Sequence, residues 1–202
     1  MASDTADRIL GAACDLIAED GIDEVRIARV AQRAGASTAL VHHYFSTREE
    51  LLEQALVHSF EQAGDERFGQ EAAPGTTTAT EALAAAIRES LPYPGAQRRE
   101  WVLWVELWLR AVRDEDLRPI AARMYERYCN WMSEVIQAGV DAGEFSADVD
   151  VARISDRAIA LLDGTGVRAL FSDPAMDVEA ARRTIAAALA ADLGVEADAL
   201  LD

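Results

Sequence analysis

The sequence predicts an all-α fold of about nine helices, and three observations lead to that prediction. The alternation of apolar and polar residues that marks half-buried strands is absent along the chain. Alanine, leucine and arginine are abundant, and all three favour helices. Apolar residues recur three and four positions apart in one segment after another. With 202 residues, of which 50% are hydrophobic, the chain is long enough to bury a core in one or two domains.

The first helices include a helix-turn-helix. A helix is expected over residues 4–20, with Gly21 ending it. Two short helices follow within residues 26–45, separated by a turn at Gly35. Ser37 is a good N-cap for the second of them, because its hydroxyl can accept a hydrogen bond from an unpaired backbone N–H. In such a motif, the first turn of this second helix enters the major groove of DNA.

The later helices complete two predicted domains. Ser46 and Glu49 have the spacing of a capping box and predict the start of a fourth helix. Small polar and turn-forming residues predict a loop over residues 71–79. Long helices that carry tryptophan begin after the fourth helix, which places one domain at residues 4–64 and a second at 65–202. The further helices are expected over residues 80–91, 97–113, 116–142, 150–171 and 177–193.

Several function classes are excluded at this level. No stretch approaches 18 apolar residues without a charge, and the first residues lack the pattern of a signal peptide, so we expect a cytoplasmic protein and no membrane partner. Cys14 and Cys129 fit no metal or redox spacing. His42 and His43 diverge by about 100° around a helix and have no obvious carboxylate partner. Without a nucleophile–base pair, a metal cluster or a phosphate loop, we expect no enzyme, no metal and no cofactor.

The helix-turn-helix segment is locally basic in an acidic chain. Residues 22–48 carry four arginines against two carboxylates, a net charge of +2, which leaves −19 for the rest of a chain whose formal net charge is −17. Neutralising phosphates is the main source of affinity for DNA, so such an island is what a DNA-binding surface requires. Arg29 belongs to this island, and Arg33 is either part of it or a solvated helix face. Tyr44 and Phe45 are expected in the core.

Residues 4 to about 60 resemble the DNA-binding domain of the TetR family of repressors. The resemblance rests on the helix that ends in Gly21, and on Val30-Ala31, Ala34-Gly35-x-Ser37, His43-Tyr44-Phe45 and Ser46-x-Arg48-Glu49-x-Leu51. It implies a DNA-binding transcriptional regulator, a homodimeric repressor that a small effector releases from a double-stranded operator.

The same resemblance assigns roles to individual positions. It implies that Arg26, His42 and Arg48 hold the DNA backbone. The residues nearest the bases would then be Ser37, Thr38, Ala39 and His43, with Ala39 and Leu40 able to contact thymine methyl groups. Three positions depart from the family, because Arg26, Thr38 and His42 stand where threonine, lysine and an aromatic residue are usual. The departures at Arg26 and His42 support an alternative, a helical adaptor with degenerate DNA binding.

The segment 101–110 is the most distinctive part of the second half. Trp101, Trp104 and Trp108 share one face of a helix that is apolar nearly all round, which predicts a buried central helix. The tryptophans either belong to the core or line a ligand cavity, where each ring would attract an organic cation by roughly 0.5–2 kcal/mol. Glu106 lies opposite them and needs a partner, either Arg110 one turn on or a cationic ligand. Asp163, within an apolar run, poses the same question.

The second half is also similar to the choline-responsive, BetI-like branch of that family. The shared features are Trp-x-x-Trp-x-Glu-Leu-Trp, Gly143-Glu-Phe145 and Leu162-Asp-Gly164. This similarity implies a small cationic effector, such as a quaternary ammonium compound or a polyamine. A neutral hydrophobic ligand is the alternative.

The last two helices are predicted to form the dimer. Their apolar stripes would pack in a four-helix bundle across a twofold axis. The reading helices of such a dimer lie one DNA turn apart, roughly 34–36 Å, so the operator is expected to be pseudo-palindromic. The stripe residues predicted at the interface are Val151, Ile154, Ala158, Leu161, Leu162, Ile185 and Leu189.

Overall fold

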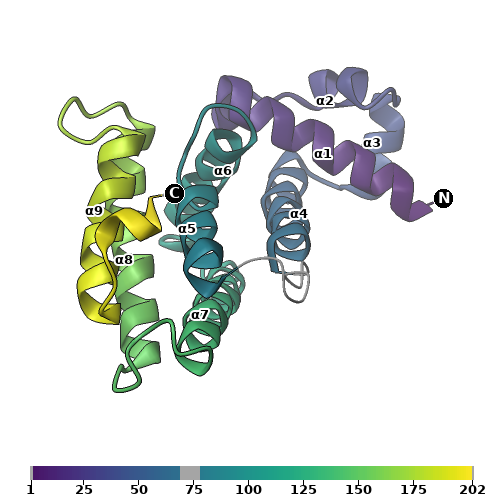
Figure 1. The fold of residues 1–202 in the computed structure, drawn as a ribbon. Coiled ribbons are helices and arrows are strands. Elements are labelled where there is room, and N and C mark those ends of the chain that lie inside the picture. Colours follow the sequence, from purple (N-terminus) through teal and green to yellow (C-terminus); the bar gives the residue numbers. More distant parts are fainter. Residues whose placement is uncertain (1, 69–77, 202) are drawn as a thin grey trace. The chain divides into compact units, whose positions relative to one another are not determined.

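The computed structural model describes residues 2–68 and 78–201, and in these ranges it contains nine α-helices, two short 3-10 helices and no strand (Figure 1). The all-α prediction is confirmed. The loop predicted over 71–79 lies outside the described residues up to position 77, and Ala79 already begins a helix. The elements are α1 (Ala2–Asp20), η1 (Ile22–Glu24), α2 (Ile27–Arg33), α3 (Thr38–Tyr44), α4 (Arg48–Phe68), α5 (Ala79–Glu89), α6 (Ala96–Ala111), α7 (Arg118–Asp141), α8 (Val151–Leu170), α9 (Val178–Leu193) and η2 (Ala197–Leu200).

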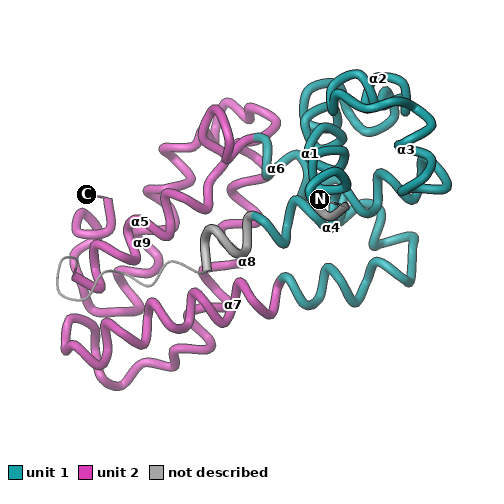
Figure 2. Tube along the Cα trace, turned by 90° about the vertical axis from the view of Figure 1, so that its right-hand side faces the viewer, with its two compact units in different colours: residues 1–69, 99–124 teal, residues 70–98, 125–202 magenta. Residues whose placement is uncertain are grey.

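The chain forms two compact units that do not follow the sequence order (Figure 2). Unit 1 comprises residues 1–69 and 99–124, and unit 2 comprises residues 70–98 and 125–202. Most of α6 therefore packs with the N-terminal helices, because Leu103 and Leu107 are buried in the same core as α1 and α4. The tryptophan-bearing helices begin after α4, but this change of composition does not indicate which of the two cores buries α6. A functional boundary at residues 64/65 stays a prediction.

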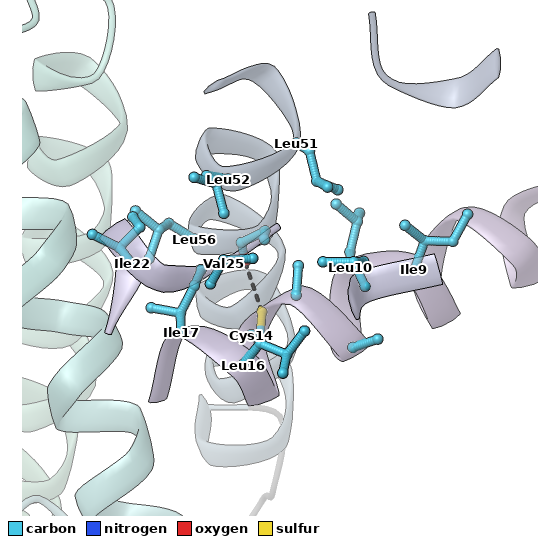
Figure 3. Packing of buried hydrophobic residues seen from close by; sticks show 14 of the residues in the cluster. Ile9, Leu10, Cys14, Leu16, Ile17, Ile22, Val25, Leu51, Leu52 and Leu56 are labelled. Carbon is cyan, nitrogen blue, oxygen red and sulfur yellow. Dashed lines mark hydrogen bonds between the residues drawn. The ribbon is translucent and has the colours of Figure 1, made fainter. Parts of the chain in front are cut away.

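The core of unit 1 is centred on the packing of α1 against α4 (Figure 3). Ile17 of α1 and Leu52 and Leu56 of α4 are fully buried there. The thiol of Cys14 lies in this core and donates a hydrogen bond to the carbonyl of Ala55 at 3.1 Å. Burial raises the pKa of Cys14 to about 12, so this thiol stays protonated and serves as a small core residue.

Local capping signals position the N-terminal helices, with one correction. Gly21 follows α1 with φ 84°, a conformation that glycine adopts without strain. The capping box predicted on Ser46 and Glu49 is wrong by one residue. The backbone N–H of Glu50 donates to the hydroxyl of Thr47 at 3.0 Å, and the carboxylate of Glu50 accepts from the backbone of Ser46 at 2.7 Å. The segment Ser-Thr-Arg-Glu-Glu permits both registers, and α4 begins at Arg48.

The apolar stripes of α8 and α9, predicted to form the dimer, lie in the core of unit 2. Five of the seven predicted interface residues are buried within the single chain, namely Ile154, Ala158, Leu162, Ile185 and Leu189. The packing of α8 against α9, and of α9 against α5, covers these stripes. Periodicity identifies an apolar face but does not identify the surface that covers it. Of the predicted set, Val151 and Leu161 are partly exposed.

The segment after α7 ties that helix to the start of α5. The carboxylate of Glu144 accepts hydrogen bonds from the backbone N–H groups of Ala79 at 3.0 Å and Thr80 at 2.9 Å, and from the Thr80 hydroxyl at 2.8 Å. These bonds hold the pKa of Glu144 below its usual range. The buried ring of Phe145 packs directly on Gly139, where an added Cβ would lie 2.1 Å from a ring carbon. Gly139 is therefore required by the packing of this ring.

Within the described ranges, none of the helices combines the length and the apolar character needed to cross a membrane.

Candidate nucleic-acid interface and effector sites

The turn between α2 and α3 is built by backbone hydrogen bonds around Gly35. Gly35 has φ 62°, and the N–H of Ala36 donates to the carbonyl of Ala31 at 2.8 Å. The hydroxyl of Ser37 accepts from the N–H of Leu40 at 3.1 Å, so the predicted N-cap is confirmed. Buried Val41 fixes the inner face of α3. These contacts hold a short helix rigidly at the surface of unit 1.

The outer face of α3 is exposed where the sequence predicts contacts with bases. Ser37 and Ala39 are exposed, and Leu40 is half-buried; Thr38, His42 and His43 are also exposed. Phe45 is buried and Tyr44 packs against the core, in agreement with their predicted places. The first turn of α3 thus offers small and polar side chains on a fixed scaffold, which is the geometry that major-groove reading requires.

Arg48 has a structural role that the sequence did not indicate. Its guanidinium donates to three carbonyls in and after η1, those of Ile22 at 2.7 Å, Asp23 at 3.1 Å and Val25 at 2.7 Å. The Arg48 side chain is only 26% exposed. It therefore fastens η1, which precedes α2, to the start of α4. Its predicted contact with the DNA backbone stays a prediction.

The remaining arginines form ion pairs that reduce the predicted basic island. Arg29 pairs with Asp20 at 2.8 Å, and Arg33 makes a two-point contact with Glu19 at 3.0 and 2.7 Å. The hydrogen bond from Arg33 holds the pKa of Glu19 below its usual range. These carboxylates come from the last turn of α1, outside residues 22–48, so the net charge of +2 overstates the local positive charge. Arg33 lies on a partly exposed face of α2 and is paired with Glu19, and a contact between Arg33 and DNA stays a prediction.

Arg26 occupies the N-cap position of α2 rather than its first turn. Its backbone is extended, with φ −121° and ψ 140°. Its guanidinium donates to the carbonyl of Asp23 at 2.5 Å, and the residue remains exposed. An arginine held in this way has N–H groups left for a phosphate.

Unit 1 contains a pocket of about 600 Å³ between η1 and the end of α6. Glu106 lies here, where burial raises its pKa and nearby Arg110 lowers it in part. Of the two predicted partners of Glu106, Arg110 forms no hydrogen bond or ion pair with it among the described side chains, and a cationic ligand at Glu106 stays a prediction. The expected burial of α6 holds for the face of Leu103 and Leu107 but not for Leu109, which is 55% exposed. The pocket is lined by Ile22, Asp23, Glu106, Leu109, Arg110, Arg113, Asp114 and Glu115.

The tryptophans of α6 contribute to the packing of unit 1. Trp101 is buried. The ring of Trp104 lies 4.4 Å from that of Phe60 in α4 and 5.5 Å from that of Trp108, measured between ring centroids. The core interpretation therefore describes Trp101 and Trp104. A ligand-binding role for the three rings stays a prediction.

Asp163 of α8 lies in unit 2 beside aromatic residues of α7. The hydroxyl of Tyr125 donates to its carboxylate at 2.7 Å. Burial raises the pKa of Asp163, and this hydrogen bond lowers it in part. One turn further along α7, the rings of Tyr128 and Trp131 stack with an interplanar angle of 12° and centroids 5.7 Å apart. Glu106 and Asp163 belong to different units.

Sequence reasoning missed Tyr125, Tyr128 and Trp131 as candidate site residues. The available signal was their spacing of three, which places aromatic rings on successive turns of one helix. The described residues contain no group of three or more histidine, cysteine or acidic residues that could hold a metal ion.

Two family models match the chain. Residues 9–55 match the model for bacterial regulatory proteins of the tetR family, and residues 79–194 match that for the C-terminal part of BetI-type transcriptional repressors.

Among curated proteins, the chain is similar to two regulators named BetI, both described as HTH-type transcriptional regulators. It is 27% identical to the one from Rhizobium meliloti over 172 residues, which cover 85% of this chain and 81% of the relative. It is 28% identical to the one from Brucella anthropi over 161 residues, which cover 79% of this chain and 78% of the relative.

Two solved structures have a similar fold. One is a transcriptional regulator from Saccharomonospora viridis in complex with choline, with a TM-score of 0.76, 28% identity and coverage of 91% of this chain and 94% of the other. The other is a TetR transcription regulator from Haloarcula marismortui, with a TM-score of 0.79, 28% identity and coverage of 95% and 99%.

Proposed function

Because this chain belongs to the TetR family of bacterial regulatory proteins and carries a BetI-type C-terminal domain, we propose that it is a homodimeric repressor that a small organic cation releases from a pseudo-palindromic operator. Family membership makes it a DNA-binding transcriptional repressor. The dimer, the symmetry of the operator and the cationic effector are the parts that we add. A repressor of this kind acts in the cytoplasm, where the operator is.

The exposed first turn of α3 supports operator binding through the predicted residues. The side chains of Thr38, Ala39 and His43 are exposed and can contact base edges. The Ser37 cap fixes the start of the helix that carries them. Arg26 and His42 are exposed and are the phosphate contacts that we propose. Because the local positive charge is small, the helix-turn-helix of one subunit binds DNA weakly. Useful affinity requires that one dimer bind two half-sites.

The dimer interface that we propose is the outer surface of α8 and α9, not their buried stripes. Small side chains lie exposed there and permit close approach of helices from two subunits. A Cβ added at Gly164 would meet no atom within 4 Å, and Phe171, at the end of α8, is 65% exposed. The outer residues are Ala160, Gly164, Thr184, Ala187 and Ala191, with Val151 and Leu161 at the edge.

The observation that carries the cationic effector is the half-buried carboxylate of Asp163. Among the described residues it forms no ion pair, and its hydrogen-bond partner is the hydroxyl of Tyr125. A quaternary ammonium group next to Asp163 would neutralise the carboxylate and contact the rings of Tyr128 and Trp131. The choline bound by the Saccharomonospora viridis regulator supports this chemical class.

Release requires that the cation bind the two states of the repressor unequally. Helices α6 and α7 each contribute residues to both units, so the chain is continuous from the effector site to the reading unit. We propose that effector binding displaces α4. The separation of the two reading helices would then depart from roughly 34–36 Å, and the dimer would no longer fit both half-sites.

Operator binding and release can be measured directly with DNA from upstream of the gene. We expect a mobility shift with two protein chains per palindrome that weakens at higher salt, because phosphate contacts release counterions. Choline at millimolar concentration should reverse the shift. Failure of binding across genomic fragments would favour the adaptor. Release by a neutral or anionic compound, with no effect of choline, betaine aldehyde, putrescine or spermidine, would overturn the cationic effector.

Replacing Asp163 by asparagine should weaken choline binding on the order of 10-fold or more, about 1.4 kcal/mol, and leave operator affinity unchanged. Asparagine keeps the size and an acceptor for Tyr125 but removes the charge. Because the pKa of Asp163 is raised, protons compete with the cation from a higher pH than for an ordinary aspartate, so wild-type affinity for choline should fall as the pH is lowered.

Asp156→Asn is the matched control, because Asp156 is an exposed carboxylate on the same helix. Calorimetric titration with choline at several pH values compares the three proteins. Equal affinities in wild type and Asp163→Asn would remove Asp163 from the site.

A further inference from the structure

We propose that the pocket between η1 and the end of α6 is a second ligand site, and that it takes an α-amino acid with an apolar side chain. The site lies wholly in unit 1 and is separate from Asp163. Its volume of about 600 Å³ is large enough for such a molecule.

The charges of this pocket are of both signs and are unpaired. Among the described side chains, Asp23, Glu106, Arg110 and Arg113 form no side-chain hydrogen bond and no ion pair, although all four line the pocket. Glu106 and Arg110 have the i,i+4 spacing that favours a pair on a helix, and Arg110 lies close enough to lower the pKa of Glu106, but the two side chains form no hydrogen bond or ion pair. Two free carboxylates and two free guanidinium groups match a ligand that carries one charge of each sign.

The other two carboxylates of the pocket already have local partners. The side chain of Asp114 accepts a hydrogen bond from the backbone of Asp116 at 2.9 Å. That of Glu115 pairs with Arg118 at 3.1 Å. The charge of Glu115 is therefore balanced by Arg118, whereas Asp114 keeps its negative charge. Carboxylates and guanidinium groups both line the pocket, and this suits a ligand that carries an ammonium group and a carboxylate.

The two inner charged groups are costly as they stand. The Nε atom of Arg110 is buried and has no acceptor. Burial also raises the pKa of Glu106, because its charged form is poorly hydrated. An unsatisfied buried donor costs roughly 1–3 kcal/mol, which a bound carboxylate would remove. The carboxylate of the amino acid is therefore assigned to Arg110 and Arg113, and its ammonium group to Glu106 and Asp23.

Apolar residues specify the rest of the ligand. Ile22 from η1 and Leu109 from α6 line the same pocket, and Leu109 is 55% exposed. An aliphatic side chain placed against them would bury apolar surface on both. Since Arg48 holds the carbonyls of Ile22 and Asp23, the ligand would contact the same short segment that Arg48 fastens to α4.

The test is a ligand-observed NMR titration of the full-length protein with L-leucine and two truncated analogues. Isocaproate keeps the carboxylate and the side chain, and isoamylamine keeps the ammonium group and the side chain. We expect saturable binding of L-leucine with one site per chain, and binding at least about tenfold weaker for each analogue. No saturable binding, or equal binding of either analogue, would overturn the proposal.

Variants locate the binding in this pocket. Glu106→Gln and Arg110→Gln should each weaken L-leucine binding at least about tenfold. Glu24→Gln should leave it unchanged, because Glu24 is an exposed carboxylate of η1 that does not line the pocket. Equal effects of all three would refute the assignment. Asp163→Asn should bind L-leucine normally, so failure of this site and failure of the cationic effector are separate results.

Discussion

Replacing Ala39 by glutamate is expected to lower operator affinity at least about 100-fold while leaving the folded structure intact. Ala39 is exposed in the first turn of α3, so a longer side chain meets no protein atoms that must move. The new carboxylate would face the DNA from both subunits of a dimer. Like charges brought together in an interface cost several kcal/mol, and 100-fold corresponds to about 2.7 kcal/mol.

Ala122→Glu provides the matched control. Ala122 is an exposed alanine of α7, and the substitution changes the net charge by the same amount. Mobility shift compares operator affinities, and circular dichroism melting verifies the fold. A similar loss in both variants would show that overall charge, rather than the surface of α3, controls binding.

Ala39 is a sharper probe than Arg48. Arg48→Ala would remove a proposed phosphate contact, but it would also release the three carbonyls of η1 and its flanking residue. Loss of operator binding in that variant would therefore have two explanations. Ala39→Glu has one, provided that the melting curve is unchanged.

Replacing Gly139 by alanine is expected to destabilise unit 2 by about 1–3 kcal/mol. The added Cβ would overlap the buried ring of Phe145 at 2.1 Å, and Phe145 is only 4% exposed. The ring cannot move away without opening the core or shifting the segment in which Glu144 caps the start of α5. For a chain of this length, each kcal/mol lowers Tm by roughly 2–4 °C.

Gly11→Ala is the control with the same chemical change. Gly11 lies inside α1, and a Cβ there meets no atom within 4 Å. Alanine favours a helix over glycine by roughly 0.5–1 kcal/mol, so Gly11→Ala should be neutral or stabilising. Thermal unfolding followed by circular dichroism measures both. A Gly139→Ala protein as stable as the Gly11→Ala protein would contradict the packing of Phe145 on α7.

Short-range features of the chain were predictable from sequence. The helices, the turn at Gly35, the Ser37 cap and the burial of Phe45 all depend on residues within about one helical turn of each other or on helical periodicity. The ordered motif that resembles the TetR family depends on the same local relations, and the family match confirms it. Even here the choice between Glu49 and Glu50 as capping partner was open, because adjacent acidic residues fit two registers.

Long-range features were decided only by the folded chain. Arg48 reaches carbonyls more than 20 residues away, and Arg33 pairs with Glu19 of α1. The stripes of α8 and α9 cover each other instead of a second subunit, and Glu106 lies beside η1 rather than paired with Arg110. Helical periodicity states which face of each helix is apolar. The partner of that face, and the group that a long charged side chain reaches, depend on how segments distant in sequence pack, and this information is carried by no single stretch of residues.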